Sequence, residues 1–134
     1  MSGPLPGPLP GPLRVAIIGS RRRQDRAAVE AFVATLPGDA VVISGGAPGP
    51  DRFAEAAAQA RGLPVVVHRP DLASVRSYPD AARRYHARNQ RIVDDADLVV
   101  AFVAPDRKGG TEDAIRRARR AGKRVLIREP GGDA

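Results

Sequence analysis

The sequence has no cysteine and no tryptophan, and only 4% of its 134 residues are aromatic. The lack of cysteine excludes disulfides, thiolate catalysis and cysteine-based metal sites, and two histidines without spaced acidic partners predict no metal site. No run approaches the ~18 apolar residues of a membrane span. The N-terminus has neither the basic start nor the apolar stretch of a signal peptide. We therefore expect a cytoplasmic protein that has no membrane contact and a core of Val, Ile, Leu and Ala.

Basic residues outnumber acidic ones, with 22 Lys and Arg against 15 Asp and Glu and a formal net charge of +7. Clustered arginines neutralise phosphates, so this basic protein could have a nucleic-acid partner. Acidic residues are interleaved through most of the basic segments, which favours ordinary solvated helix surfaces instead.

Proline and glycine mark both ends of the chain. The repeat "GPLPGPLPGPL" fixes φ and removes backbone donors, so residues 1–12 are predicted to form a disordered or polyproline-like tail. Residues 130–134, within "EPGGDA", are predicted to be a loose C-terminus. The length between them, residues 13–129, is that of a single domain.

Within this domain, β-branched apolar runs alternate with helical patterns. Strands are predicted at 14–19, 40–44, 64–68, 97–103 and 123–128, and helices at about 23–36, 50–61, 79–94 and 111–121. Strands that are apolar on both faces predict a parallel sheet covered on both sides. Right-handed crossovers then favour a Rossmann-like, doubly wound α/β fold with strand order 3-2-1-4-5.

Ligands in such sheets bind beyond the carboxyl ends of the strands. Three glycine-rich segments leave those ends and open helices: "GSRRR", "SGGAPGPDRFAE" and "APDRKGGTEDA". Backbone N–H groups and helix N-termini would converge there into an anion site. Three arginines at a helix start oppose the helix dipole unless an anion lies between them, so a phosphate would explain residues 21–23.

Each segment also has an explanation without a ligand. The small residues from Ser44 to Gly49 could form a tight turn, with Pro50 and Asp51 suited to the first turn of a helix. Thr111 could be an N-cap followed by two acidic residues. The agreement of three loops is more informative than any one of them.

The helix predicted at 79–94 has an inward stripe through Ala81 or Ala82, Tyr85 and Ile92, with Arg88 and Asn89 on or beside it. Buried polar side chains need partners, so these two either bond carbonyls at the end of the sheet or hold a ligand. The tyrosines and phenylalanines are expected mostly in the core.

Taken together, "IIGSR", "SGGAPGPDRFAEAAA", "RNQRIVDDADLVVAF" and "GGTEDAI" resemble, in this order, the YspA-like branch of the SLOG superfamily, named after the Smf/DprA proteins and the LOG nucleotide hydrolases. The similarity extends over about residues 14–128. It implies a Rossmann-like fold that binds a nucleotide or a nucleotide-derived ligand, such as an ADP-ribose-like molecule, at the carboxyl end of the sheet.

The loops and the resemblance together give the candidate ligand-binding residues: Gly19, Ser20, Arg21, Ser44, Gly45, Gly46, Gly49, Asp51, Arg88, Asn89, Gly109, Gly110 and Thr111. Backbone N–H groups of the glycine loops would cradle phosphate, and Arg21 or Arg88 would neutralise it. Asp51 or Asn89 would bind ribose hydroxyls.

The chain departs from LOG-type phosphoribohydrolases, which have a Pro-Gly-Gly-x-Gly-Thr loop with a glutamate two residues past the threonine. Here "DRKGGTED" lacks that start and has Asp113 at the glutamate position. Glu112 and Asp113 are the candidate catalytic residues for cleavage of an N-glycosidic bond, and whether the protein is an enzyme stays open.

Three functions follow. A sensor or carrier that binds a nucleotide derivative is favoured, because phosphate-cradling loops are present while an unambiguous catalytic pair is not. The alternatives are a LOG-like nucleoside monophosphate phosphoribohydrolase and DprA-like binding of single-stranded nucleic acid through arginine-rich helices. Alanine-rich helix faces could form a homodimer interface or cover the sheet.

Overall fold

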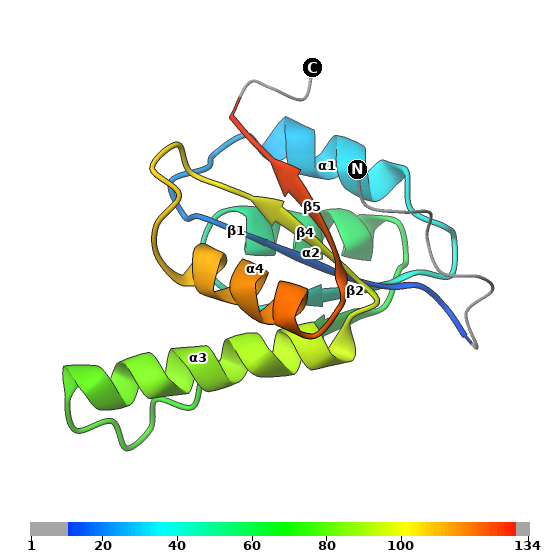
Figure 1. The fold of residues 1–134 in the computed structure, drawn as a ribbon. Helices are drawn as coiled ribbons and strands as arrows, with labels where there is room; N and C mark the ends of the chain where they lie inside the picture. Colours follow the sequence, from blue (N-terminus) through cyan, green and yellow to red (C-terminus); the bar gives the residue numbers. More distant parts are fainter. Residues whose placement is uncertain (1–10, 131–134) are drawn as a thin grey trace.

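A five-stranded parallel sheet forms the centre of the computed structural model, which describes residues 11–130 (Figure 1). Its elements along the chain are β1 (Arg14–Gly19), α1 (Arg26–Ala34), β2 (Val41–Ser44), α2 (Pro50–Ala60), β3 (Val65–Val67), α3 (Tyr78–Asp95), β4 (Leu98–Phe102), α4 (Gly110–Arg120) and β5 (Arg124–Arg128). The strand order β3-β2-β1-β4-β5 confirms the predicted fold class. The predicted N-terminal tail and loose C-terminus lie outside the described residues, apart from residues 11, 12 and 130.

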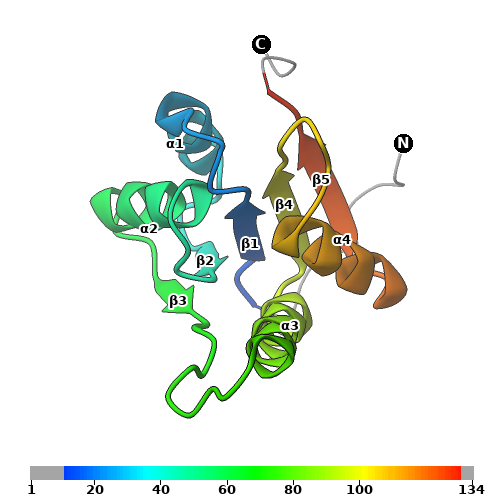
Figure 2. The ribbon, with the colours of Figure 1, turned by 90° about the vertical axis from the view of Figure 1, so that its left-hand side faces the viewer.

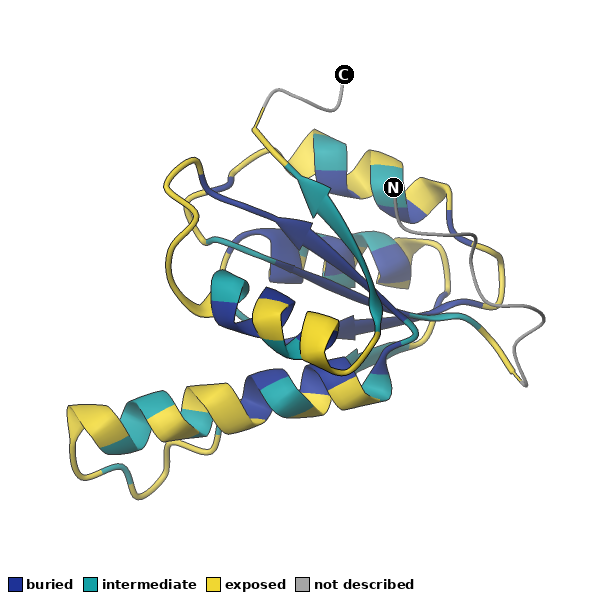
Figure 3. Cartoon of the chain, in the orientation of Figure 1, coloured by how far each residue is buried: buried dark blue, intermediate teal, exposed yellow. Residues whose placement is uncertain are grey.

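Two apolar cores lie on opposite faces of the sheet. Along β1, Val15 and Ile17 pack against α1 and α2, whereas Ala16 and Ile18 belong to the core under α3 and α4. Figure 2 shows these two helix pairs on either side of the strands, and Figure 3 shows the buried faces that they turn to the sheet. The alanines of α2 take part in this packing, since Ala54 and Ala58 are fully buried.

Helix α1 begins at Arg26, three residues later than predicted. Its N-cap is Asp25, whose carboxylate bonds the guanidinium of Arg23 instead of a helix N–H group. The arginines at 21–23 therefore lie in the loop before the helix and not in its first turn.

Helix α3 is longer than its contact with the sheet. Its buried residues are Arg88, Asn89, Ile92 and Val93 in the C-terminal half, while the N-terminal half projects past the sheet (Figures 1 and 3). Consequently Tyr78 is 87% exposed and Tyr85 39% exposed. The expectation that these tyrosines belong to the core was wrong, because the helix runs beyond the strands that would have covered them.

Candidate ligand site at the carboxyl end of the sheet

A cavity of about 1120 Å³ opens beyond the carboxyl ends of the strands. The loops that follow β1, β2 and β4 line it, together with the β3–α3 segment and one face of α3. The strand order reverses between β1 and β4, so the cavity lies at the topological switch point where open α/β sheets bind ligands.

Most of the candidate residues lie around this one cavity. The lining includes Gly19, Ser20, Arg21, Gly45, Gly46, Asp51, Arg88, Asn89, Gly109, Gly110, Thr111 and Asp113. Three candidates are not part of the lining: Ser44, Gly49 and Glu112. The structure thus brings segments far apart in the sequence to one place.

The three consecutive arginines have three different environments. Arg23 is buried, and its guanidinium donates to the carbonyl oxygens of Val103 and Arg128 at 2.8 Å each. Arg22 forms an exposed ion pair with Asp106 at 2.6 Å. Arg21 lines the cavity, and its side chain makes no hydrogen bond or ion pair within residues 11–130. Among these three arginines, Arg21 is therefore the one whose guanidinium is available to an anion. Arg23 instead joins the loop to the carbonyl oxygens at the ends of β4 and β5.

The β2–α2 loop is organised by side chains on both sides of it. The Oγ of Ser44 accepts from the N–H of Gly46 and donates to Glu55 at 2.6 Å. The N–H of Gly45 donates to the Oδ2 of Asp51 at 2.9 Å. Ser44 thus shapes the loop from behind, which explains why it does not face the cavity.

Asp51 is a buried carboxylate, only 3% exposed, in the first turn of α2. Burial raises the pKa of Asp51 to about 6, while the bond from Gly45 and the charge of Arg88 oppose that rise. Its second oxygen, Oδ1, is buried and has no hydrogen-bond partner among the described residues. A carboxyl group with such a pKa beside a cavity is characteristic of functional sites.

Arg88 and Asn89 connect α3 to the two glycine loops. The guanidinium of Arg88 donates to the carbonyl oxygen of Gly45 at 2.6 Å and to the amide oxygen of Asn89 at 3.0 Å. The amide nitrogen of Asn89 donates to the Gly110 carbonyl and to Asp113 at 3.2 and 3.0 Å. Arg88 thus bonds a carbonyl just past the end of β2, as the interpretation without a ligand predicts, whereas the carbonyl bonded by Asn89 belongs to the start of α4. Both residues also line the cavity.

The β4–α4 loop differs from the prediction at its cap. Helix α4 begins at Gly110 with Gly109 as N-cap at φ 97°, so Thr111 is the second helical residue and not the N-cap. A left-handed φ favours glycine at position 109. The helix start therefore presents backbone N–H groups at the edge of the cavity.

The two candidate catalytic carboxylates are both paired with arginines. Glu112 accepts two bonds from Arg107, at 2.7 and 3.1 Å, and does not line the cavity. Asp113 accepts from Asn89 and from Arg117. Its burial would raise its pKa, but the bonds from Arg117 and Asn89 outweigh burial and hold the pKa below its usual value. An ionised, paired carboxylate is a poor general acid.

Several lining residues were not among the candidates. Five of them add positive charge: Arg22, Arg52, Arg69, Lys108 and Arg116. Five others are apolar or aromatic: Leu72, Tyr78, Ala82, Tyr85 and His86. Lys108 and Arg52 adjoin candidate residues, so the loop motifs could have pointed to them. The β3–α3 segment has no motif in the sequence, and nothing signalled that it reaches the cavity.

The charge of the lining is strongly positive. Seven cationic side chains, Arg21, Arg22, Arg52, Arg69, Arg88, Lys108 and Arg116, face the cavity with only two carboxylates, Asp51 and Asp113. Helices α2 and α4 also begin at the cavity, and their N-termini add partial positive charge. This arrangement favours an anionic ligand.

The strand order and this cavity define the class of the protein as a Rossmann-like α/β fold with a ligand-sized cavity at its switch point. Residues 13–74 match the model of the family YAcAr, described as the YspA, cpYpsA-related SLOG family. The resemblance inferred from the sequence is thereby confirmed over these residues. The match contains the motifs in β1 and in the β2–α2 region, while the other two motifs lie beyond residue 74.

Among solved structures, the chain is similar to the X-ray structure of DNA processing protein A (DprA) from Streptococcus pneumoniae, with a TM-score of 0.71 and 20% sequence identity. The similarity covers 92% of this chain and 52% of that chain, so this chain spans about half the length of the DprA structure. At this identity the likeness shows the fold alone. No curated protein matches the sequence.

Within residues 11–130, no helix combines the length and the apolar character of a membrane span. The same residues contain no group of three or more His, Cys, Asp or Glu side chains that could hold a metal ion.

Proposed function

We propose that this protein binds a nucleotide or a nucleotide-derived ligand in the cavity, as a sensor or carrier that does not turn the ligand over. The observation that carries the proposal is the lining, where glycine-rich loops and two helix N-termini meet seven cationic side chains and two carboxylates. The similarity to a SLOG family supports nucleotide or nucleic-acid binding as the ligand class.

In this proposal the phosphate lies between the β1–α1 loop and the starts of α2 and α4. Backbone N–H groups of Gly110 and Thr111 would donate to it, while the N–H groups of Gly45 and Gly46 already bond Asp51 and Ser44. Arg21 would neutralise the charge. We prefer Arg21 to Arg88 for this role because the guanidinium of Arg88 is already bonded to Gly45 and Asn89.

The contact with a ribose hydroxyl is assigned to Asp51. Its buried Oδ1 has no donor among the residues that the structure describes, and an unmet buried acceptor costs roughly 1–3 kcal/mol. Both hydrogens of the Asn89 amide nitrogen are committed to Gly110 and Asp113. Asn89 would therefore position the α4 loop and not bind the ribose.

Binding without turnover is preferred because neither candidate catalytic carboxylate is available. Glu112 is held by Arg107 outside the lining, and Asp113 is paired with Arg117 and Asn89. Glycosidic cleavage needs an acid to protonate the leaving group or a base to activate water. Both candidate carboxylates are ion-pair partners, and the other carboxyl group at the cavity, that of Asp51, is assigned to the ribose contact.

A thermal-shift screen tests this function. AMP, ADP-ribose, NAD, cyclic nucleotides and a short single-stranded oligonucleotide are added separately, and each is then assayed by chromatography for release of its base. A ligand at 100 times its dissociation constant should add about 2.7 kcal/mol to stability. We expect stabilisation by one nucleotide class without base release. Base release that is lost in a Glu112→Gln, Asp113→Asn double variant would establish the phosphoribohydrolase instead.

Binding of single-stranded nucleic acid is a second candidate, favoured by one observation. Arg116 lines the cavity, and the exposed Arg119 and Arg120 continue from it along α4. The similar structure is, by its name, a DNA processing protein. If a polymer binds, the logarithm of its affinity should fall by about 0.7 per phosphate contacted for each tenfold rise in salt.

The predicted cytoplasmic location and homodimer stay predictions.

A further inference from the structure

Part of the cavity lining, here called the aromatic wall, is apolar and aromatic and comes from α3 and the β3–α3 segment. The large apolar side chains that are most exposed in residues 11–130 are Leu72, Tyr78 and Tyr85, at 42, 87 and 39%. All three line the same cavity. Because exposed apolar patches commonly mark binding surfaces, their concentration at one site requires an explanation other than core packing.

The two tyrosines share one face of α3. Tyr78, Ala82 and Tyr85 are spaced by four and three residues and all line the cavity, as expected for neighbours on a helix. The tyrosines are thus separated by about 10 Å along the axis, at about 1.5 Å per residue. Ala82, whose side chain is small, lies between them on this face of the helix.

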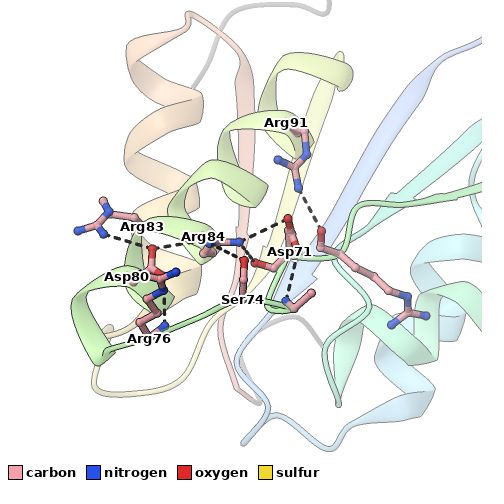
Figure 4. A network of polar contacts seen from close by, with 9 residues as sticks. Asp71, Ser74, Arg76, Asp80, Arg83, Arg84 and Arg91 are labelled. Carbon is pink, nitrogen blue, oxygen red and sulfur yellow. Dashed lines mark hydrogen bonds and ion pairs between the residues drawn. The ribbon is translucent and has the colours of Figure 1, made fainter.

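The β3–α3 segment carries Leu72, and polar contacts with α3 hold it in place (Figure 4). Arg84 of α3 donates to the carbonyl oxygen of Asp71 at 2.8 Å, and Arg91 donates to that of Arg69 at 3.0 Å. These bonds hold the segment against both halves of α3, through Arg84 in the N-terminal half and Arg91 in the C-terminal half. The aromatic wall is therefore built by the fold and does not depend on a loose loop.

Tyr85 is also connected to the basic half of the cavity. The guanidinium carbon of Arg88 lies 5.6 Å from the centre of the Tyr85 ring, within the range of a cation–π interaction. Arg88 itself is bonded to the Gly45 carbonyl in the β2–α2 loop. A ligand seated on Tyr85 would thus reach the glycine loops.

We propose that Tyr85, with Ala82, Tyr78 and Leu72 around it, is the subsite for the heterocyclic base of the ligand. The inference rests on the proposed function, because it places the base of the same ligand whose phosphate the proposed function places at the basic loops. A planar base stacks on an aromatic ring without base-specific hydrogen bonds, and the phosphate end fits the cationic half. The cavity is large enough for both, since typical ligand pockets measure about 300–1,000 Å³.

Isothermal titration calorimetry with matched probes tests this subsite. The four nucleoside monophosphates AMP, GMP, CMP and UMP carry both a base and a phosphate, whereas ribose 5-phosphate lacks only the base. We expect at least one monophosphate to bind the wild-type protein more tightly than ribose 5-phosphate. In Tyr85→Ala the affinity for that nucleotide should fall by about 5- to 150-fold, with no change for ribose 5-phosphate.

Two more variants sharpen the result. Tyr85→Phe keeps the ring and should bind the nucleotide within about threefold of wild type, since the face of the ring and not its hydroxyl makes the stack. Arg83 lies on the same helix, is exposed and does not line the cavity, so the Arg83→Ala variant should bind the nucleotide as wild type does. Because Tyr85 is exposed, its replacement should leave the melting temperature nearly unchanged.

The outcomes separate the two proposals. Equal binding of the monophosphates and ribose 5-phosphate, or equal weakening of both in Tyr85→Ala, would overturn the base subsite and leave phosphate binding intact. If neither kind of probe binds the wild-type protein, the proposed function fails and the base subsite fails with it.

Discussion

Among single residues, Arg23 shows that a basic cluster in a loop can be structural. Its buried guanidinium joins the β1–α1 loop to the Val103 and Arg128 carbonyls. Arg23→Ala leaves the Val103 carbonyl without this donor and opens a void, so we expect a loss of about 2–4 kcal/mol in the free energy of unfolding. Arg22→Ala, which removes an exposed ion pair, should cost less than about 1 kcal/mol. Equal stability of the two variants in urea denaturation would contradict these assignments.

Asp51 predicts a dependence of stability on pH. Burial raises its pKa from 3.8 to about 6, so between these values the folded protein keeps a proton that the unfolded chain has lost. The group's contribution to stability is therefore greatest below pH 3.8 and falls as the pH rises to about 6. At about 1.36 kcal/mol per pKa unit the fall is about 3 kcal/mol.

The comparison with Asp51→Asn isolates this effect, since other carboxylates titrate in both proteins. In urea denaturation, the stability of the variant relative to wild type should increase by about 2–2.5 kcal/mol between pH 4 and pH 7, because the amide that replaces the carboxyl group has no charge to bury. A difference that stays constant across this interval would show that Asp51 titrates normally in the folded protein.

The sequence could not distinguish the three arginines of "GSRRR". The loop motif correctly predicted that this segment lies at the carboxyl end of the sheet. The fate of each side chain depends on distant partners, however: Arg23 on the ends of β4 and β5, and Arg22 on Asp106. Such long-range contacts leave no local pattern in the chain.

Among the elements, the β2–α2 loop approaches α3 so closely that a side chain at Gly45 would force its neighbours to shift. A Cβ there would lie 2.6 Å from Nη1 of Arg88 and 2.9 Å from Oδ2 of Asp51. Gly45→Ala should therefore displace Arg88 and destabilise the protein by about 1–3 kcal/mol.

A matched substitution is available at the start of α4. A Cβ at Gly110 meets nothing within 4 Å, so Gly110→Ala should leave stability unchanged or raise it slightly, since alanine is the better helix former. Urea denaturation of both variants checks the comparison. Equal stability of Gly45→Ala and Gly110→Ala would contradict the close packing of the β2–α2 loop against α3.

The helices and strands themselves could largely be predicted, because β-branched runs and helical spacing are local signals. The structure places β1 at the predicted residues and α3 within one residue of its predicted ends. The side-chain environment of α3 could not be predicted, since the helix pattern does not show how far the sheet extends beneath it. Tyr85 therefore lies in the cavity wall although its spacing indicated the core.

At the scale of the whole molecule, the apolar cores and the candidate site lie in different parts of the fold. The apolar cores on both faces of the sheet are built from residues that the sequence pattern identified, such as Ile17 and Ile92. The site lies where loops from several strands meet, and its motifs predicted the glycine loops but only two of the seven cationic side chains, Arg21 and Arg88. The aromatic half comes from the β3–α3 segment and the projecting end of α3, whose positions depend on tertiary contacts.

The central claim is that the basic half of the cavity binds a ligand phosphate through Arg21. The measurement that tests it most directly is a calorimetric comparison of AMP with adenosine, which lacks the phosphate, on wild-type protein, Arg21→Ala and Arg119→Ala. Arg119 is exposed and does not line the cavity, so its replacement removes the same charge elsewhere. We predict that AMP binds wild type and Arg119→Ala equally, more tightly than adenosine, and about 10- to 150-fold more weakly to Arg21→Ala. Equal affinities of wild type for AMP and adenosine, or an unchanged AMP affinity in Arg21→Ala, would contradict the account.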